Sequence, residues 1–219
     1  MPLRQRRPVI PRAEVIIDRV RDHRTQTRST GAVRGLMIHR CGIDLKSGVV
    51  IGYDAVEICD AFTGRDERWP TVAKATNSQN PYTFYVGGDR GHADLHGQVW
   101  QALDLNEIGH HGRGCSSTHI GIGLIGDFRV DMPGAKQWGA AVSLCADLCL
   151  MLGLAPSRVV GHGEVDEAHG GSKAPGKPAA CPGDRLVMGV FRESLSGVMK
   201  TRVNRDAAWR LEDSGYRLP

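Results

Sequence analysis

Residues 120–126 of this chain have the sequence Ile-Gly-Ile-Gly-Leu-Ile-Gly. A short apolar run predicts a buried strand, and its glycines allow other segments to approach the backbone closely. Working outward, four further runs predict strands, at residues 36–39, 82–86, 97–100 and 158–161. Apolar residues at three-to-four spacing predict helices at residues 55–62, 135–152 and 184–199. We therefore expect one α/β domain, a central mixed β-sheet flanked by helices.

Three parts are expected along the chain. Its 219 residues suffice for one sizeable core, and 41% apolar with 24% charged residues is ordinary globular composition. Residues 1–30 are expected to form a basic N-terminal arm, residues 31–199 the folded domain, and residues 200–219 a charged C-terminal tail. Glycine, proline and polar residues predict loops at residues 65–80, 105–118 and 166–180.

Charge and hydropathy argue against several classes of protein. A net charge of +4 is too small to indicate nucleic-acid binding by itself. Four arm arginines are interpreted as a solvated surface, with contact to an anionic polymer as the alternative: Arg4, Arg6, Arg7 and Arg12. No apolar stretch is long enough to span a membrane, and no apolar core follows the basic N-terminus as in a signal peptide. We expect a cytoplasmic monomer whose six cysteines are reduced.

Two histidines stand at an unusual place, because His39 and His162 each end a short apolar strand. Side chains at strand ends lie at the mouth of a sheet, where binding sites form. Cys181 follows a flexible loop and precedes a predicted helix. A thiolate and two neutral imidazoles suit zinc, and three protein ligands leave a fourth position for water, as in catalytic sites. The alternative is ordinary core or loop histidines, since such widely separated ligands match no local metal motif.

Seven short segments occur in an order that resembles a known family. They are LMIHRC (36–41), PYTFYV (81–86), GQVWQ (97–101), GHHGRG (109–114), THIGIGLIG (118–126), GHGEV (161–165) and CPG (181–183). Their order over residues 33–197 resembles the type-2 zinc N-acetylmuramoyl-L-alanine amidases. That family shares its fold with peptidoglycan recognition proteins and includes phage endolysins.

The resemblance implies an activity and a set of site residues. The activity is hydrolysis of the amide between N-acetylmuramic acid and L-alanine in peptidoglycan or muropeptides, in a phage or prophage endolysin that acts on the cell wall at lysis. By position, His39, His162 and Cys181 would hold Zn2+. Tyr82 would position water or stabilise the oxyanion, since a phenol is a hydrogen-bond donor at neutral pH. His111 would bind the substrate.

Two positions depart from the family pattern. Ala179 stands where many relatives have lysine or threonine, so Lys177 becomes the candidate catalytic helper, with a solvated loop lysine as the alternative. Gly123 stands where some members carry a glutamate base, and Glu164 is a substitute candidate. These departures keep open a catalytically weak or inactive peptidoglycan-binding module of the same fold, although Cys181 argues for an enzyme. A basic protein associated with nucleic acid is the third hypothesis.

Overall fold

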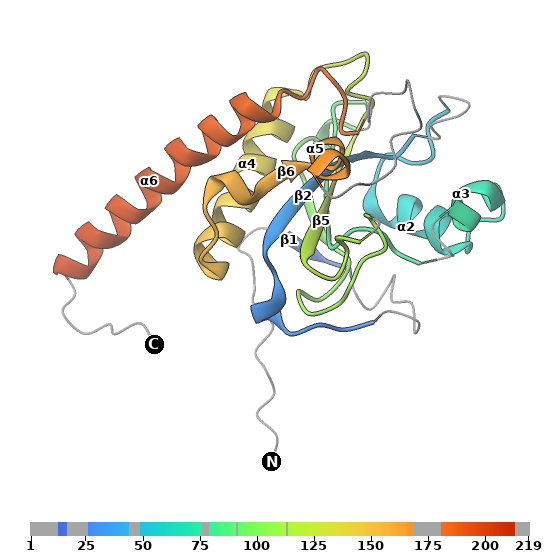
Figure 1. The fold of residues 1–219 in the computed structure, drawn as a ribbon. Coiled ribbons are helices and arrows are strands. Elements are labelled where there is room, and N and C mark those ends of the chain that lie inside the picture. The colour runs from blue at the N-terminus through green and yellow to red at the C-terminus, as the bar shows by residue number, and fades with distance from the viewer. Residues whose placement is uncertain are drawn as a thin grey trace.

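A computed structural model describes residues 13–16, 26–43, 49–75, 79–90, 92–112, 114–168 and 181–212 (Figure 1). Within them, six strands form one sheet in the order β1-β4-β3-β5-β2-β6. The strands are β1 Ala13–Val15, β2 Gly35–Cys41, β3 Phe84–Val86, β4 Val99–Gln101, β5 His119–Ile125 and β6 Val159–Gly161. The pair β3–β4 is antiparallel and the other four neighbouring pairs are parallel. The expected mixed sheet is confirmed.

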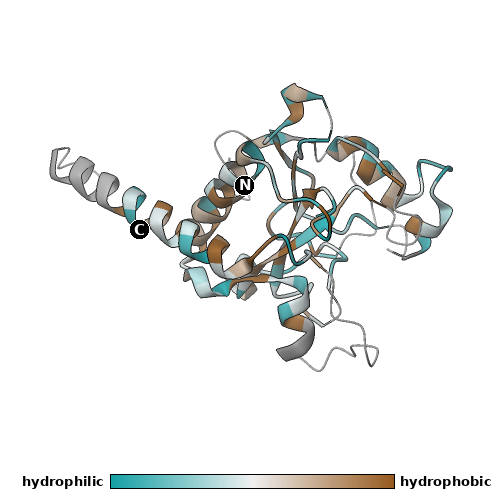
Figure 2. Ribbon diagram, turned by 90° about the horizontal axis from the view of Figure 1, so that it is seen from above, coloured by the Kyte–Doolittle hydropathy of each residue, from teal (hydrophilic) through white to brown (hydrophobic). Residues whose placement is uncertain are grey.

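Helices cover both faces of this sheet (Figure 1). On one side lie α2 and α3, and on the other lie α4 and α6, side by side. The helices are α2 Ala55–Thr63, α3 Pro70–Ala75, α4 Ala135–Leu152, α5 His162–Ala168 and α6 Met188–Glu212, with short 3-10 turns η1 Thr30–Ala32, η2 Ala93–Leu95 and η3 Pro156–Arg158. Seen from above, brown and teal residues mix along the helices, as amphipathic helices require (Figure 2). Among the described residues, no helix combines the length and hydropathy that a membrane crossing needs.

Alternation along β2 separates the two sides of the core. Leu36 and Ile38 face the core formed with α4 and α6, whereas Cys41 belongs to the core formed with α2. Successive strand residues point to opposite faces, so His39 shares its face with Met37 and Cys41. The candidate ligand therefore lies on the side of α2 and α5, away from the main core under α4 and α6.

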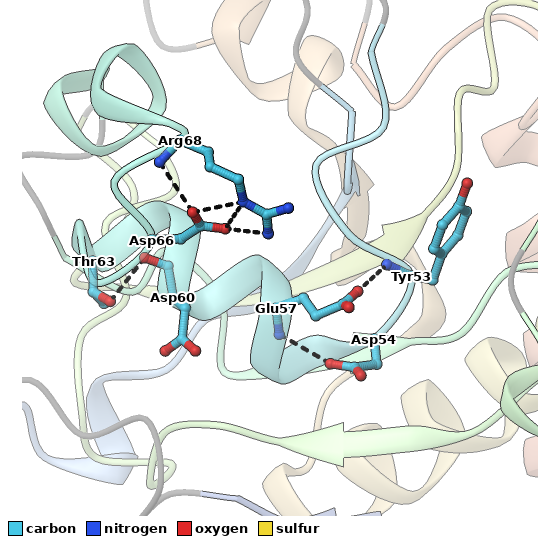
Figure 3. A network of polar contacts seen from close by, with 7 residues as sticks. All are labelled: Tyr53, Asp54, Glu57, Asp60, Thr63, Asp66 and Arg68. Carbon is cyan, nitrogen blue, oxygen red and sulfur yellow. Dashed lines mark hydrogen bonds and ion pairs between the residues drawn. The ribbon is translucent and has the colours of Figure 1, made fainter.

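Helix α2 begins and ends at residues suited to those positions, and Figure 3 shows the residues at its start. The Asp54 carboxylate accepts hydrogen bonds of 2.8 and 2.9 Å from backbone N–H groups of the first turn. In return, Glu57 accepts a 2.8 Å bond from the Tyr53 backbone N–H. Gly64 ends the helix with a φ of 79°, a left-handed conformation that glycine adopts without a steric penalty. The capping pair and the glycine together explain why the predicted helix forms here.

Element boundaries differ from the prediction in several places. Helix α3 lies inside the range 65–80, so the loop predicted there is wrong. Proline suits the first turn of a helix, and Val72 is buried in the core formed with α2, which outweighs the loop-like composition. Strand β2 continues to Cys41, so His39 lies inside the strand and not at its end. Strand β1 and the last turns of α6 fall in the ranges expected as arm and tail. The four arm arginines lie outside the described residues.

Candidate metal centre

The pairing of β2 with β6 brings the two histidines together. These strands run parallel, with Ile38 opposite Gly161. The next residue in each segment is a histidine, His39 within β2 and His162 just after β6, and their ring centroids are 4.6 Å apart. His162 is also the first residue of α5, where the chain leaves the sheet. Helix α5 therefore starts at the very point where the second candidate ligand is needed.

Cys181 reaches these histidines through a turn held by close backbone contacts. Its carbonyl accepts a 2.7 Å hydrogen bond from the Gly163 backbone N–H. The Cys181–Pro182 peptide bond is cis, and a Cβ at Gly161 would lie 2.9 Å from Cδ of Pro182. Gly183 has a φ of 121°, and a Cβ there would lie 2.4 Å from the backbone carbon of Phe128. Because Gly161 and Gly183 have no side chains, the turn at Cys181–Pro182 can pack closely against β6 and Phe128.

The three candidate ligands fit a zinc ion. One donor atom from each of His39, His162 and Cys181 lies within 4.8 Å of the other two, and among the described residues this is the one such group. The distance from Cys181 Sγ to His39 Nδ1 is 3.7 Å. Usual zinc–sulfur and zinc–nitrogen bond lengths at a tetrahedral angle require about 3.6 Å. The group therefore has the donor chemistry and the spacing of a three-ligand site with an open fourth position.

The surroundings of His39 favour its neutral form. The side chain is 1% exposed. Burial, followed by the neighbouring His111 and His162, holds its pKa well below the ordinary value. A neutral imidazole has one lone pair available, which is the form that binds metal.

Tyr82 lies beside the candidate ligands. Its ring centroid is 4.9 Å from that of His39, 6.0 Å from Phe62 and 5.5 Å from Tyr85. Burial, followed by the proximity of Cys41 and Cys181, raises the pKa of Tyr82 well above its usual value. The hydroxyl therefore keeps its proton at neutral pH and can donate a hydrogen bond. Tyr82 is placed next to the site as predicted, and its catalytic role stays a prediction.

His111 also lies at this site, but it is 7% exposed. Its Nδ1 is 3.2 Å from His39 Nε2, and its Nε2 is 3.1 Å from the His119 carbonyl oxygen. Burial lowers the pKa of His111 to about 3. Binding of substrate by His111 stays a prediction. Lys177 and Ala179 lie outside the described residues.

Glu164 has other partners in this structure. Its carboxylate oxygens accept hydrogen bonds of 2.8 and 2.9 Å from the Arg192 guanidinium. The Gly161 backbone N–H donates a further bond of 2.8 Å. These bonds connect α5 to α6 and to the end of β6. They give Glu164 a structural role that does not require a catalytic one.

Arg28 lies in the range expected as a basic arm, but its side chain bonds within the folded domain. Its Nη1 donates to the carbonyl oxygens of Ser116, at 2.6 Å, and His119, at 3.1 Å. Burial lowers the pKa of Arg28 to about 10. Because its partners are about 90 positions away in the sequence, no local pattern could separate this arginine from those in a solvated arm.

The fold is of the mixed α/β class, and its three clustered donors could hold a metal ion. The profile of the N-acetylmuramoyl-L-alanine amidase family matches residues 29–184, most of the chain, and this chain belongs to that family. Peptidoglycan-recognition protein LB of Drosophila melanogaster is 29% identical over 124 residues, which is 56% of this chain and 44% of that protein. The chain spans less than half the length of the curated relatives it matches.

Solved structures share the fold at low sequence identity. A selenomethionine derivative of AmpD has a TM-score of 0.62 at 16% identity, covering 86% of this chain and 97% of that one. The Ph2119 endolysin from the Thermus scotoductus MAT2119 bacteriophage has a TM-score of 0.56 at 20% identity, covering 84% and 98%. The amidase and peptidoglycan-recognition-protein fold expected from the sequence is confirmed. At such identities these structures are evidence of fold alone.

Proposed function

We propose that this protein hydrolyses the amide between N-acetylmuramic acid and L-alanine in peptidoglycan, with zinc held by His39, His162 and Cys181. The observation that carries the proposal is the donor group itself, with its donor atoms within 4.8 Å of one another and Tyr82 alongside. Membership of the amidase family supports the choice of substrate. A zinc ion with three protein ligands supplies a Lewis acid that activates water and polarises a carbonyl.

The chain's own residues have separate tasks in this reaction. His39 and His162 would present imidazole nitrogens to the metal, and Cys181 would give up its thiol proton when metal binds, so the ligand set would carry one formal negative charge. Tyr82 keeps its phenol proton and donates a hydrogen bond to the oxygen that gains charge as the amide carbonyl is attacked. Donors prearranged for such an oxygen accelerate acyl transfer because they need no reorganisation during the reaction.

The test is zinc content measured beside digestion of purified muropeptides. The wild-type chain is compared with Cys181→Ala and with the control Cys145→Ala, in the α4 core. We expect one zinc per chain and release of free stem peptides from the wild type and the control, and neither from Cys181→Ala. Zinc bound without cleavage would favour a peptidoglycan-binding module of the same fold. No zinc in the wild type would remove the basis of the proposal.

We propose further that the enzyme is a phage or prophage endolysin that stays in the cytoplasm until lysis. Membership of the amidase family is compatible with an enzyme that acts on the cell wall, and the shared fold with a phage endolysin is compatible with this role. Expression in a bacterial host tests it. Growth should continue until the inner membrane is permeabilised, and turbidity should then fall with the wild type but not with Cys181→Ala. Lysis before permeabilisation would contradict the cytoplasmic location.

A further inference from the structure

We propose that His111 is a positioning residue that holds His39 in the tautomer whose Nδ1 is free to bind metal. The inference rests on the proposed zinc centre and concerns a contact inside it. A continuous line of polar atoms leads from the candidate ligands into the protein. Cys181 Sγ is 3.7 Å from His39 Nδ1, and His39 Nε2 is 3.2 Å from His111 Nδ1. The line ends at the His119 carbonyl oxygen, 3.1 Å from His111 Nε2.

The carbonyl at the end of this line determines where each proton lies. A carbonyl oxygen can only accept, so Nε2 of His111 must carry the proton of that bond. A neutral imidazole has one N–H, so Nδ1 of His111 is an acceptor. The proton between the two rings must then belong to Nε2 of His39. This leaves the lone pair of His39 on Nδ1, the nitrogen that faces Cys181.

The loop that carries His111 is built to hold this ring. Ser116 Oγ accepts hydrogen bonds from the backbone N–H groups of His111, at 3.3 Å, and Gly112, at 3.0 Å. It also donates to the Gly112 carbonyl oxygen at 2.9 Å. Beneath the ring lies Gly121 of β5, where a Cβ would come 2.7 Å from Cδ2 of His111. The loop and the strand therefore leave this ring little freedom to turn.

The carbonyl that fixes the line is itself held in place. Arg28 Nη1 donates to the same His119 oxygen at 3.1 Å. A carbonyl oxygen has two lone pairs, so it can accept from the arginine and from His111 together. Two donors from distant segments thus keep the acceptor at a constant position, which a tautomer-selecting hydrogen bond requires.

A contact with substrate would place different demands on His111. The side chain is 7% exposed, and both ring nitrogens already have protein partners. A substrate group would have to displace His39 or the His119 carbonyl to bond with this ring. The contacts of His111 instead match those of the usual partner of a metal-binding histidine. Such a partner accepts a hydrogen bond from the ring nitrogen that does not bind metal, and so orients the ring.

Two nearly isosteric variants test the role of the acceptor. In His111→Asn, the amide oxygen can occupy the place of Nδ1 and still accept from His39, whereas His111→Leu offers no acceptor. Affinity for Zn2+ is measured by competition with a chelating dye. We expect the asparagine variant to stay within about threefold of the wild type, and the leucine variant to bind about 10- to 100-fold more weakly. Thermal unfolding of the metal-free variants checks that both are folded.

A second readout does not require metal or activity. Nitrogen-15 NMR of the metal-free wild type should show His39 protonated on Nε2, and this preference should be lost in His111→Leu. Unchanged zinc affinity and an unchanged tautomer in the leucine variant, with a raised KM, would overturn the inference in favour of substrate contact. Equal loss in both variants would overturn it as well. If the wild type binds no zinc, the proposed function fails, while the tautomer measurement still decides the role of His111.

Discussion

The ring of Tyr82 lies directly against Gly123 of β5, where an added Cβ would come 2.7 Å from Cδ2 of the tyrosine. The same Cβ would lie 2.8 Å from Sγ of Cys41. Some family members carry a glutamate at the position of Gly123, which made this glycine a departure in the sequence comparison. In this structure a side chain at 123 and the observed position of Tyr82 exclude each other. The glycine is therefore part of how Tyr82 reaches the site.

Gly123→Ala should disturb Tyr82 and lower both activity and stability. Overpacking of a tight site costs about 1–3 kcal/mol, and we expect a loss of unfolding free energy in that range. Urea unfolding and muropeptide hydrolysis measure the two effects. Gly139→Ala is the matched control, because a Cβ there meets nothing within 4 Å in helix α4. Alanine in that helix should stabilise slightly. Full activity in Gly123→Ala would show that Tyr82 tolerates the displacement.

Tyr82→Phe should lower kcat by about 100- to 1000-fold, the usual cost of removing one donor to a developing oxyanion. Zinc affinity and the unfolding temperature should change little, because the ring and its packing remain. Tyr85→Phe serves as the control. It removes a buried hydroxyl that lies 2.6 Å from Asn80 Oδ1, so it should reduce stability and leave kcat near the wild-type value. A wild-type kcat in Tyr82→Phe would remove the tyrosine from the mechanism.

Arg28→Met should destabilise the protein by about 1–3 kcal/mol, because buried carbonyl groups lose a charged donor. The carbonyls affected are those of Ser116 and His119, on the loop that carries His111 and at the start of β5. Urea unfolding of the metal-free protein gives the value. Arg34→Met, at an exposed position, should have a much smaller effect. Equal effects of the two substitutions would indicate that Arg28 contributes little through these bonds.

Removal of zinc should lower the unfolding temperature of the wild type. A ligand that binds only the folded state stabilises it by about 2.7 kcal/mol at a free concentration 100 times its Kd. Calorimetry with and without a chelator measures the shift. In Cys181→Ala the chelator should have no effect, since one of the three candidate ligands is missing. A chelator effect of wild-type size in that variant would place the ion elsewhere.

Asp127 should make stability depend on pH at the acid end. Hydrogen bonds from Arg129, supported by the nearby charge of Arg40 at 3.5 Å, hold the pKa of this carboxyl below its ordinary value. A lowered folded-state pKa stabilises the fold above the unfolded pKa of about 3.9. That contribution is lost as pH falls through the folded-state pKa.

Urea unfolding between pH 2 and 7 should therefore show a gap between wild type and Asp127→Asn that closes toward low pH. Asp94→Asn, at an exposed position in η2, is the control. A gap that stays constant down to pH 2 would mean that the asparagine acts through packing and not through the charge of the carboxylate.

Much of the local structure is encoded in short patterns. The three-to-four spacing of apolar residues predicted α4 at residues 135–152, and the structure has the same limits. The run 120–126 predicted β5, which is observed one residue earlier, at His119–Ile125. These two predictions are correct because the periodicity of apolar residues depends only on residues close together within one helix or strand. Helix α3 was missed because its packing against α2 has no signature in a stretch containing proline and asparagine.

Residue types and motif order are enough to name the donor atoms of the site and the short elements that carry them. His39, His162 and Cys181 were recognisable by residue type and by the order of motifs around them. That the three residues meet is a result of tertiary packing, because Ile38 pairs with Gly161 and the turn after Cys181 packs against Phe128. The contact between His39 and His111 and the bonds of Arg28 also depend on tertiary structure, since they join segments about 70 to 90 residues apart. Such contacts depend on strand order and register. These are determined by the packing of side chains that lie far apart in the sequence, so no local pattern predicts them.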